Sequence, residues 1–337
     1  MPNGPVRVTV FGKTDLGRTR DHNEDTFLVA DLTQGNASLQ PEVRDHVVGE
    51  RGSLFMVADG MGGAAAGEIA SAMAADVILT HLKQTWSSDP DATSQRFAFR
   101  LKEAVELANA KINQHSKDHP EVRGMGTTVT VAGILGHELY LAQVGDSRAY
   151  LIRKGDAIQL TKDQSLMQRL VEAGELTEEE AEQSERRNII LQALGPEARV
   201  KVDLTYQPLS KGDTVVICSD GLSGQVKKEE IAEMVNQNTD LVALCSRLID
   251  MANSRGGPDN ITAVVARFEG DGLNDPRTAD EVGYQVYPLH EGEATTEPVP
   301  IYTGSPPPVS LKHQKRLVLL AVAGAVIALA AFFLLRK

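Results

Sequence analysis

Four aspartates lie where a strand-like run of this sequence meets a turn. They are Asp59 in VADGMGG, Asp220 in CSDGLSG, Asp259 in GPDNIT and Asp146 in VGDSRAY. If the flanking apolar strands share one sheet, the carboxylates gather at one end of it. Gathered carboxylates repel one another and lose hydration, so they require a compensating cation. Hard divalent ions take oxygen ligands, and paired Mg²⁺ or Mn²⁺ ions can drive hydrolysis of a phosphate ester, so the pattern predicts a two-metal hydrolase.

A second charged string, TDLGRTRDHNED, spans residues 14–25. In it Arg20 precedes Glu24 and Asp25 by one helical turn or a short loop. An arginine can hold a phosphate through two parallel hydrogen bonds. It can equally form a salt bridge with the two neighbouring carboxylates, and the string alone leaves both interpretations open.

The elements that must position these residues follow from the periodicity of the apolar positions. Strands are expected at 6–11, 25–30, 53–58, 127–135, 138–144, 148–153, 157–160, 215–218 and 261–268, and helices at 68–82, 96–113, 228–236 and 241–252. The four strands between residues 127 and 160 are joined by short turns, which predicts an antiparallel meander. Runs of strands with helices in pairs favour sheets covered by helices. The expected fold class is α+β, a four-layer α-β-β-α sandwich with two mostly antiparallel sheets flanked by helix pairs.

Residues 163–195 differ from the rest of the domain because glutamates crowd the stretch from Glu172 to Glu185. Thr177 followed by Glu180 forms a candidate capping box for a short helix. The segment fits either a solvated pair of helices or a mobile flap beside the acidic site.

Six motifs together resemble the metal-dependent PP2C-type protein serine/threonine phosphatases, especially their bacterial branch. In chain order they are RDHNED, VADGMGG, GMGTT, VGDSRAY, CSDGLSG and GPDNIT, and the flap string SERRNIILQALG is also similar. Each motif alone is weak because Asp-Gly is a common turn, but chance is a poor explanation for six in order. The resemblance covers residues 6 to 268.

The resemblance implies a role for each matched residue. Asp59 would bridge two Mn²⁺ or Mg²⁺ ions, and the Gly60 carbonyl would help to hold the second. Asp220 and Asp259 would complete the shell of the first ion, while Glu24 and Asp25 would act through bound waters. Asp146 with Asp220 would form a third, weaker ion site. Arg20 would bind the substrate phosphoryl group, so Arg20 and Asp59 are the expected catalytic residues.

Two positions depart from patterns seen in parts of that family. Some members carry a histidine two residues after the Asp-Gly aspartate, where it can protonate the leaving group, but this chain has Met61. His22 is a candidate acid, although a surface histidine is the simpler interpretation. Many relatives carry Asp-His before the flap, and this chain has Asp163 and Gln164 there.

The composition of the chain limits the classes of partner that the protein is expected to bind. The chain has 337 residues and a net charge of −12, and so acidic a protein is a poor candidate for binding nucleic acid. Cys218 and Cys245 lie in apolar surroundings, as buried free thiols in a reducing compartment would. The expected partners are phosphorylated proteins, including serine/threonine kinases and their substrates.

The end of the sequence predicts a membrane anchor. The domain is expected to span residues 1–270, followed at 271–316 by a disordered Pro-rich and acidic linker with a basic end. Leu317–Leu335 carries no charge and would be about 28 Å long as a helix, enough to cross the hydrocarbon layer. The basic residues before it, and the lack of a signal peptide, favour a single-pass inner-membrane protein with its catalytic domain in the cytoplasm.

Three functions are compatible with these features. The first is a tethered phosphatase that opposes serine/threonine kinases. The second is a phosphatase-like module that binds phosphoproteins without turnover, which the complete set of matched carboxylates disfavours. The third is a hydrolase of small phosphate esters, or a sensor linked to envelope stress. A chain ending near residue 270 is expected to keep full activity on small substrates.

Overall fold

The structure is a computed structural model, and it describes residues 4–62, 66–277 and 281–289. The strands are β1 (Arg7–Asp15), β2 (Asp25–Asp31), β3 (Asn36–Ser38), β4 (Arg44–Val47), β5 (Ser53–Met61), β6 (Gly126–Thr127), β7 (Val129–Leu135), β8 (Glu138–Val144), β9 (Arg148–Arg153), β10 (Asp156–Gln159), β11 (Asp203–Pro208), β12 (Thr214–Cys218) and β13 (Ile261–Glu269). The helices are α1 (Ala66–Thr85), α2 (Ser94–Asp118), α3 (Leu166–Glu172), α4 (Glu178–Gln183), α5 (Asp220–Ser223), α6 (Lys228–Gln237) and α7 (Leu241–Ser254), with a 3-10 turn at Pro120–Val122.

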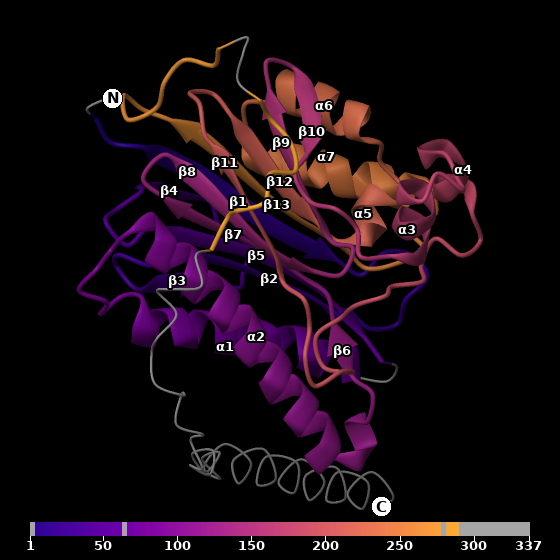
Figure 1. Ribbon diagram of the computed structural model, residues 1–337. Helices are drawn as coiled ribbons and strands as arrows, with labels where there is room; N and C mark the ends of the chain where they lie inside the picture. Colours follow the sequence, from indigo (N-terminus) through magenta and orange to yellow (C-terminus); the bar gives the residue numbers. More distant parts are fainter. Residues whose placement is uncertain (1–3, 63–65, 278–280, 290–337) are drawn as a thin grey trace, which may run out of the picture. The chain divides into compact units, whose positions relative to one another are not determined.

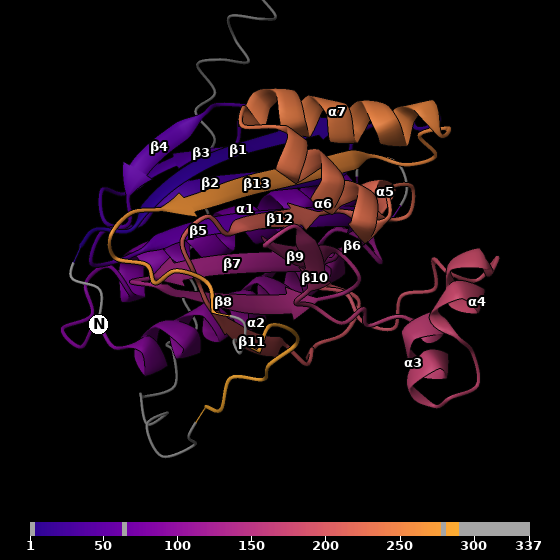
Figure 2. The ribbon, with the colours of Figure 1, turned by 90° about the horizontal axis from the view of Figure 1, so that it is seen from above.

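Two antiparallel sheets form the centre of the fold (Figure 1). The strand order is β10-β9-β12-β13-β1-β4 in the six-stranded sheet and β11-β8-β7-β5-β2-β3 in the seven-stranded sheet, where β6 also pairs with β5. Helices α6 and α7 lie on one side of the strands, and α1 and α2 lie on the other (Figure 2). The expected α+β class with two sheets and flanking helices is therefore confirmed.

Three apolar layers alternate with the two sheets. Phe27 and Val57 of one sheet pack against Val215 and Val264 of the other. On the outer faces, α1 and α2 bury an alanine-rich stripe on the seven-stranded sheet, and α6 and α7 bury aliphatic residues on the six-stranded sheet. Strands buried on both faces read as continuous apolar runs, which is why LFMVA and TVVIC stand out in the sequence.

The predicted meander between residues 127 and 160 is wrong in its pairing. The hairpin β7–β8 belongs to the seven-stranded sheet, whereas β9–β10 belongs to the six-stranded sheet. The stretch Gly145–Ser147 between β8 and β9 is therefore a crossover between sheets. A two- or three-residue turn signal does not reveal whether the next strand pairs with the previous one or leaves its sheet, because that choice depends on distant partners. The crossover places Asp146 between the two sheets.

The compact unit extends beyond the expected boundary at residue 270. Leu273 is buried, and residues 281–287 run beside the edge strand β11, where Tyr206 N–H donates to Gln285 O and Tyr287 N–H donates to Leu204 O. The Tyr287 ring makes edge contacts with Tyr140 and Tyr206 at centroid distances of 5.3 and 5.4 Å. Aromatic burial and backbone pairing thus order part of a segment whose Pro-rich, acidic composition predicts a free linker.

No helix among the described residues is both long and apolar enough to cross a bilayer. The expected span at 317–335 lies outside those residues, as does the linker from residue 290 onward.

Candidate metal centre

Five aspartates from both sheets meet at one end of the sandwich. Asp25 begins β2 and pairs in register with Asp59 near the end of β5. Asp220 directly follows Ser219 at the end of β12, Asp259 precedes β13, and Asp146 lies on the β8–β9 crossover. The expectation that the strands around these aspartates share one sheet is therefore incomplete, because the carboxylates come from the two facing sheets.

Burial and mutual repulsion raise the pKa values of four of these aspartates, Asp25, Asp59, Asp146 and Asp220. Burial and then the Asp220 charge raise the pKa of Asp25 to about 7, and burial, Asp220 and Asp163 raise that of Asp146 to about 8. The pKa of Asp59 lies well above its usual value because of burial and the charges of Asp25 and Asp220. Burial and the Asp259 charge also raise the pKa of Asp220. Arg148 and Arg20 lower the pKa of Asp220, but they pair directly with Asp163 and Asp259, so burial and mutual repulsion prevail.

Three buried carboxylate oxygens in this group have no hydrogen-bond partner among the described residues: Asp25 Oδ1, Asp146 Oδ1 and Asp220 Oδ1. A buried polar atom without a partner costs free energy unless an ion or water satisfies it. Oxygen-only donors of this kind suit Mg²⁺ or Mn²⁺. Among the described residues, no three His, Cys, Asp or Glu side chains form a ready metal cage by themselves. Backbone oxygens and water would therefore have to complete the coordination of any ion held here.

Glu24 and Gly60 lie beside the aspartates where β2, β5 and α1 meet. Gly60 N–H donates to Glu24 O at 3.1 Å. A Cβ added to Gly60 would lie 2.3 Å from Gly67 O, so this position requires glycine. A Cβ on Gly67 would lie 2.8 Å from Glu24 Oε1, so the Glu24 carboxylate lies against the first turn of α1. Negative charge is favourable at that end of a helix.

Arg20 lies at the site, and its partner is Asp259. Arg20 Nη2 is 2.7 Å from Asp259 Oδ2, and the Arg20 side chain is 50% exposed. Of the two interpretations left open by the sequence, the salt bridge is present, although with a more distant aspartate than the adjacent pair. A half-exposed guanidinium at the edge of the acidic group remains accessible to an incoming phosphate.

Asn260 connects the loops that carry the site. The sequence motifs did not single out this residue. Its Oδ1 accepts from Glu24 N–H at 2.9 Å, and its Nδ2 donates to Leu16 O at 2.9 Å and His22 O at 3.0 Å. These bonds tie the 14–25 string to the loop of Asp259. An asparagine directly after the candidate ligand in GPDNIT is the signal that could have suggested this role.

The structure shows where the residues that depart from the family pattern lie. Met61 and His22 are exposed, and the contact of His22 described above is made by its backbone carbonyl. Gln164 Oε1 accepts from Gly145 N–H at 2.9 Å, and Gln164 N–H donates to Gly145 O at 2.9 Å. Gln164 therefore fixes the start of the flap beside Asp146, where Arg148 also pairs with Asp163 at 2.7 Å.

The flap itself contains α3 and α4, which contact each other and stand away from the sheets (Figure 2). The capping box predicted at Thr177 and Glu180 is present. That the segment acts as a mobile flap beside the acidic site stays a prediction.

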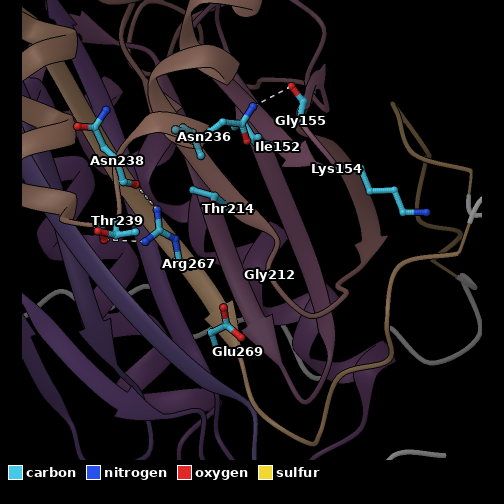
Figure 3. Close-up of a pocket in the computed structure, with 11 residues that line it drawn as sticks. Ile152, Lys154, Gly155, Gly212, Thr214, Asn236, Asn238, Thr239, Arg267 and Glu269 are labelled. Atoms are coloured by element: carbon cyan, nitrogen blue, oxygen red, sulfur yellow. Dashed lines mark hydrogen bonds between the residues drawn. The ribbon is translucent and has the colours of Figure 1, made fainter.

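A surface pocket of about 580 Å³ is lined by residues that include Thr214, Arg267 and Glu269 (Figure 3). Thr214, which begins β12, pairs in register with Arg267 near the end of β13, whereas Asp220 and Asp259 lie at the opposite ends of these strands. Arg267 donates to Thr239 O at 2.6 Å and Asn238 O at 2.8 Å. Its guanidinium thus satisfies two carbonyls just after α6, which ends at Gln237, and this is a structural role.

Comparisons with known proteins agree with the resemblance seen in the sequence. The family described as Protein phosphatase 2C matches residues 34–266. The serine/threonine phosphatase stp of Listeria monocytogenes is 36% identical over 253 residues, covering 75% of this chain and 93% of that protein. The crystal structure of the Mycobacterium tuberculosis phosphatase PstP/Ppp is 36% identical with a TM-score of 0.65, covering 78% of this chain and 99% of that one. A PstP catalytic domain solved in complex with 2 manganese ions is 34% identical, with a TM-score of 0.63 and coverage of 78% and 99%.

Proposed function

The chain belongs to the protein phosphatase 2C family, and on that premise we propose that it is a metal-dependent phosphatase that hydrolyses phosphoserine and phosphothreonine in proteins. The observation that carries the proposal is the convergence of Asp25, Asp59, Asp146 and Asp220, where three buried carboxylate oxygens have no partner in the part of the chain that the structure describes. The names of relatives, and the manganese in one of their structures, support the same activity and the same metal.

Different residues of this chain would bind the metal ions and the substrate. Asp59, Asp220, Asp259 and the Gly60 carbonyl would hold two Mn²⁺ or Mg²⁺ ions, with Glu24 and Asp25 acting through water. Asp146 and Asp220 would serve a third, weaker site. When bound, such ions neutralise phosphoryl charge and activate water as a nucleophile. Arg20 would exchange Asp259 for the phosphoryl oxygens of the substrate, adding positive charge at the edge of the site.

The substrate class is tested by comparing turnover of a phosphothreonine peptide with turnover of a mononucleotide, each in Mn²⁺ and in EDTA. We expect hydrolysis only with Mn²⁺, and a kcat/KM at least about tenfold higher on the peptide, because a protein substrate gains contacts outside the phosphoryl site. A higher kcat/KM on the nucleotide would instead favour a hydrolase of small phosphate esters.

We further propose that the segment after residue 289 tethers the enzyme to the inner face of the cell membrane. The support is in the sequence: Leu317–Leu335 is uncharged and follows basic residues at 312, 315 and 316. Confinement to a membrane raises the local concentration of kinases and substrates that reside there.

Chains of three lengths test the tether and the boundary of the domain. The full chain is expected in the membrane fraction, and a chain ending at residue 289 is expected to leave it with its activity on small esters intact. A chain ending at residue 270 loses Leu273 and the Tyr287 contacts, so its free energy of unfolding should fall by about 3 kcal/mol or more. Equal stability of the two shorter chains would show that residues 271–289 contribute nothing to the domain.

A further inference from the structure

The carboxylate of Asp25 is held on one side by two buried hydroxyl groups from the opposite sheet. Ser219 Oγ donates to Asp25 Oδ2 at 2.8 Å, and Thr262 Oγ1 donates to the same oxygen at 2.6 Å. Both Ser219 and Thr262 have an exposed fraction of 0%, and Asp25 Oδ1 has no partner among the described residues. One carboxylate oxygen is therefore fixed by protein donors, and the other is free.

The direction of these hydrogen bonds is set by what each group can donate. An ionised carboxylate only accepts, and a hydroxyl has a single proton, so the Thr262 proton that reaches Asp25 cannot also reach Thr14. Thr14 Oγ1, 2.7 Å from Thr262 Oγ1, is the alternative acceptor for that one proton. Thr14 in turn accepts from Asn23 Nδ2 at 2.8 Å. The Ser219 hydroxyl accepts from Thr262 N–H at 3.0 Å, and Asp25 Oδ2, at 2.8 Å, is a nearer acceptor for its proton than Asn260 O, at 3.4 Å.

The network connects the two sheets at the acidic end of the sandwich. Asp25 belongs to β2 of the seven-stranded sheet, whereas Thr14 and Thr262 belong to β1 and β13 of the six-stranded sheet, and Ser219 directly follows β12 of that sheet. Thr14 and Thr262 are register partners, so the pair is fixed by the ladder between β1 and β13. Hydroxyl donors built on rigid strands define the rotation of the Asp25 carboxylate more closely than loop residues would.

We propose that Ser219 and Thr262 are positioning residues, which hold Asp25 Oδ2 so that Oδ1 faces the metal centre as an oxygen available to a divalent cation or its water. The inference rests on the proposed metal-dependent function, and it assigns to two uncharged residues a part of the affinity for Mn²⁺. Groups that orient a metal-site residue in this way typically contribute 10- to 100-fold to affinity.

Calorimetric titration of the full chain with Mn²⁺ alone tests the proposal without measuring turnover. Ser219→Ala and Thr262→Val remove one donor each and are expected to raise the Kd for Mn²⁺ by about tenfold or more. Thr262→Ser keeps the hydroxyl and should bind within about twofold of the natural chain. Thr214→Val is the matched control, since Thr214 is also buried in the six-stranded sheet but lies at its far end, and its Kd should not change.

Circular dichroism in EDTA shows which variants fold. If Thr262→Val does not fold, the Kd values of Ser219→Ala and Thr262→Ser decide whether the hydroxyl groups contribute to Mn²⁺ affinity. Unchanged Kd values in folded Ser219→Ala and Thr262→Val chains would overturn the inference. The inference would also be overturned if Thr262→Ser raised the Kd for Mn²⁺ as much as Thr262→Val does, because the packing of the side chain and not its hydroxyl would then set the affinity. A natural chain that binds no Mn²⁺ at all would instead overturn the proposed function.

Discussion

Asp59→Asn is expected to lower metal-dependent hydrolysis of a phosphopeptide or an aryl phosphate by roughly a thousandfold or more, the scale seen when one group that stabilises developing charge is removed. Asp59 pairs in register with Asp25, and the charges of Asp25, Asp220 and Asp146 all act on it. The amide has the same shape as the carboxylate but no charge, so it weakens the hold on both proposed ions at once. Steady-state rates at saturating Mn²⁺ measure the effect.

The same substitution should stabilise the chain when no metal is present. Replacing one of several mutually repelling carboxylates with a neutral group removes unfavourable charge, so the unfolding temperature in EDTA at pH 8 is expected to rise. Lost activity with gained stability separates a site effect from misfolding. Asp156→Asn, at an exposed position of β10, is the control that should change neither quantity. A normal rate in Asp59→Asn would remove the two-metal proposal.

The sequence predicted most local elements well because the signals for them are local. The helix face with Ile69, Met73 and Val77 forms α1, and the buried run before Asp59 forms β5. The pairing of β8 with β11, and of β9 with β12, could not be read from the chain because those partners lie far away in sequence. The predicted meander failed for that reason, although the strands themselves are present.

In the candidate site, too, residues with local sequence signals could be predicted, whereas residues whose role depends on distant partners could not. Charged residues in short motifs drew attention to Asp59, Asp146, Asp220 and Asp259, and the structure brings these together. Uncharged residues that orient them carry a weaker signal: Ser219 and Asn260 are adjacent to candidate ligands, but serine and asparagine are also common in turns. Their roles depend on which strand ends face each other across the sandwich, and this is a property of the tertiary fold.

The metal-free chain is expected to become less stable as pH rises from about 5 to 8.5. Asp25 and Asp146 have pKa values raised to about 7 and about 8 in the folded state, while an unfolded aspartate titrates near 4. Folding therefore favours the protonated form, whose stabilisation is full below the unfolded pKa and is lost as pH rises through the folded pKa. Each pKa unit corresponds to about 1.4 kcal/mol, so several kcal/mol are lost and the unfolding temperature in EDTA should drop by roughly 10 °C or more.

Mn²⁺ should abolish this pH dependence, because bound cations supply at pH 8 the positive charge that protons supply at pH 5. Thermal unfolding measured across this range, in EDTA and in excess Mn²⁺, compares the two conditions, and metal binding near pH 6.5 should release protons that differently buffered calorimetry can count. Asp59→Asn should flatten the EDTA curve, since it removes one of the coupled groups. A metal-free chain whose stability rises between pH 5 and 8.5 would mean that these carboxylates are already ionised and paired, and the case for a cation in their midst would lose its physical basis.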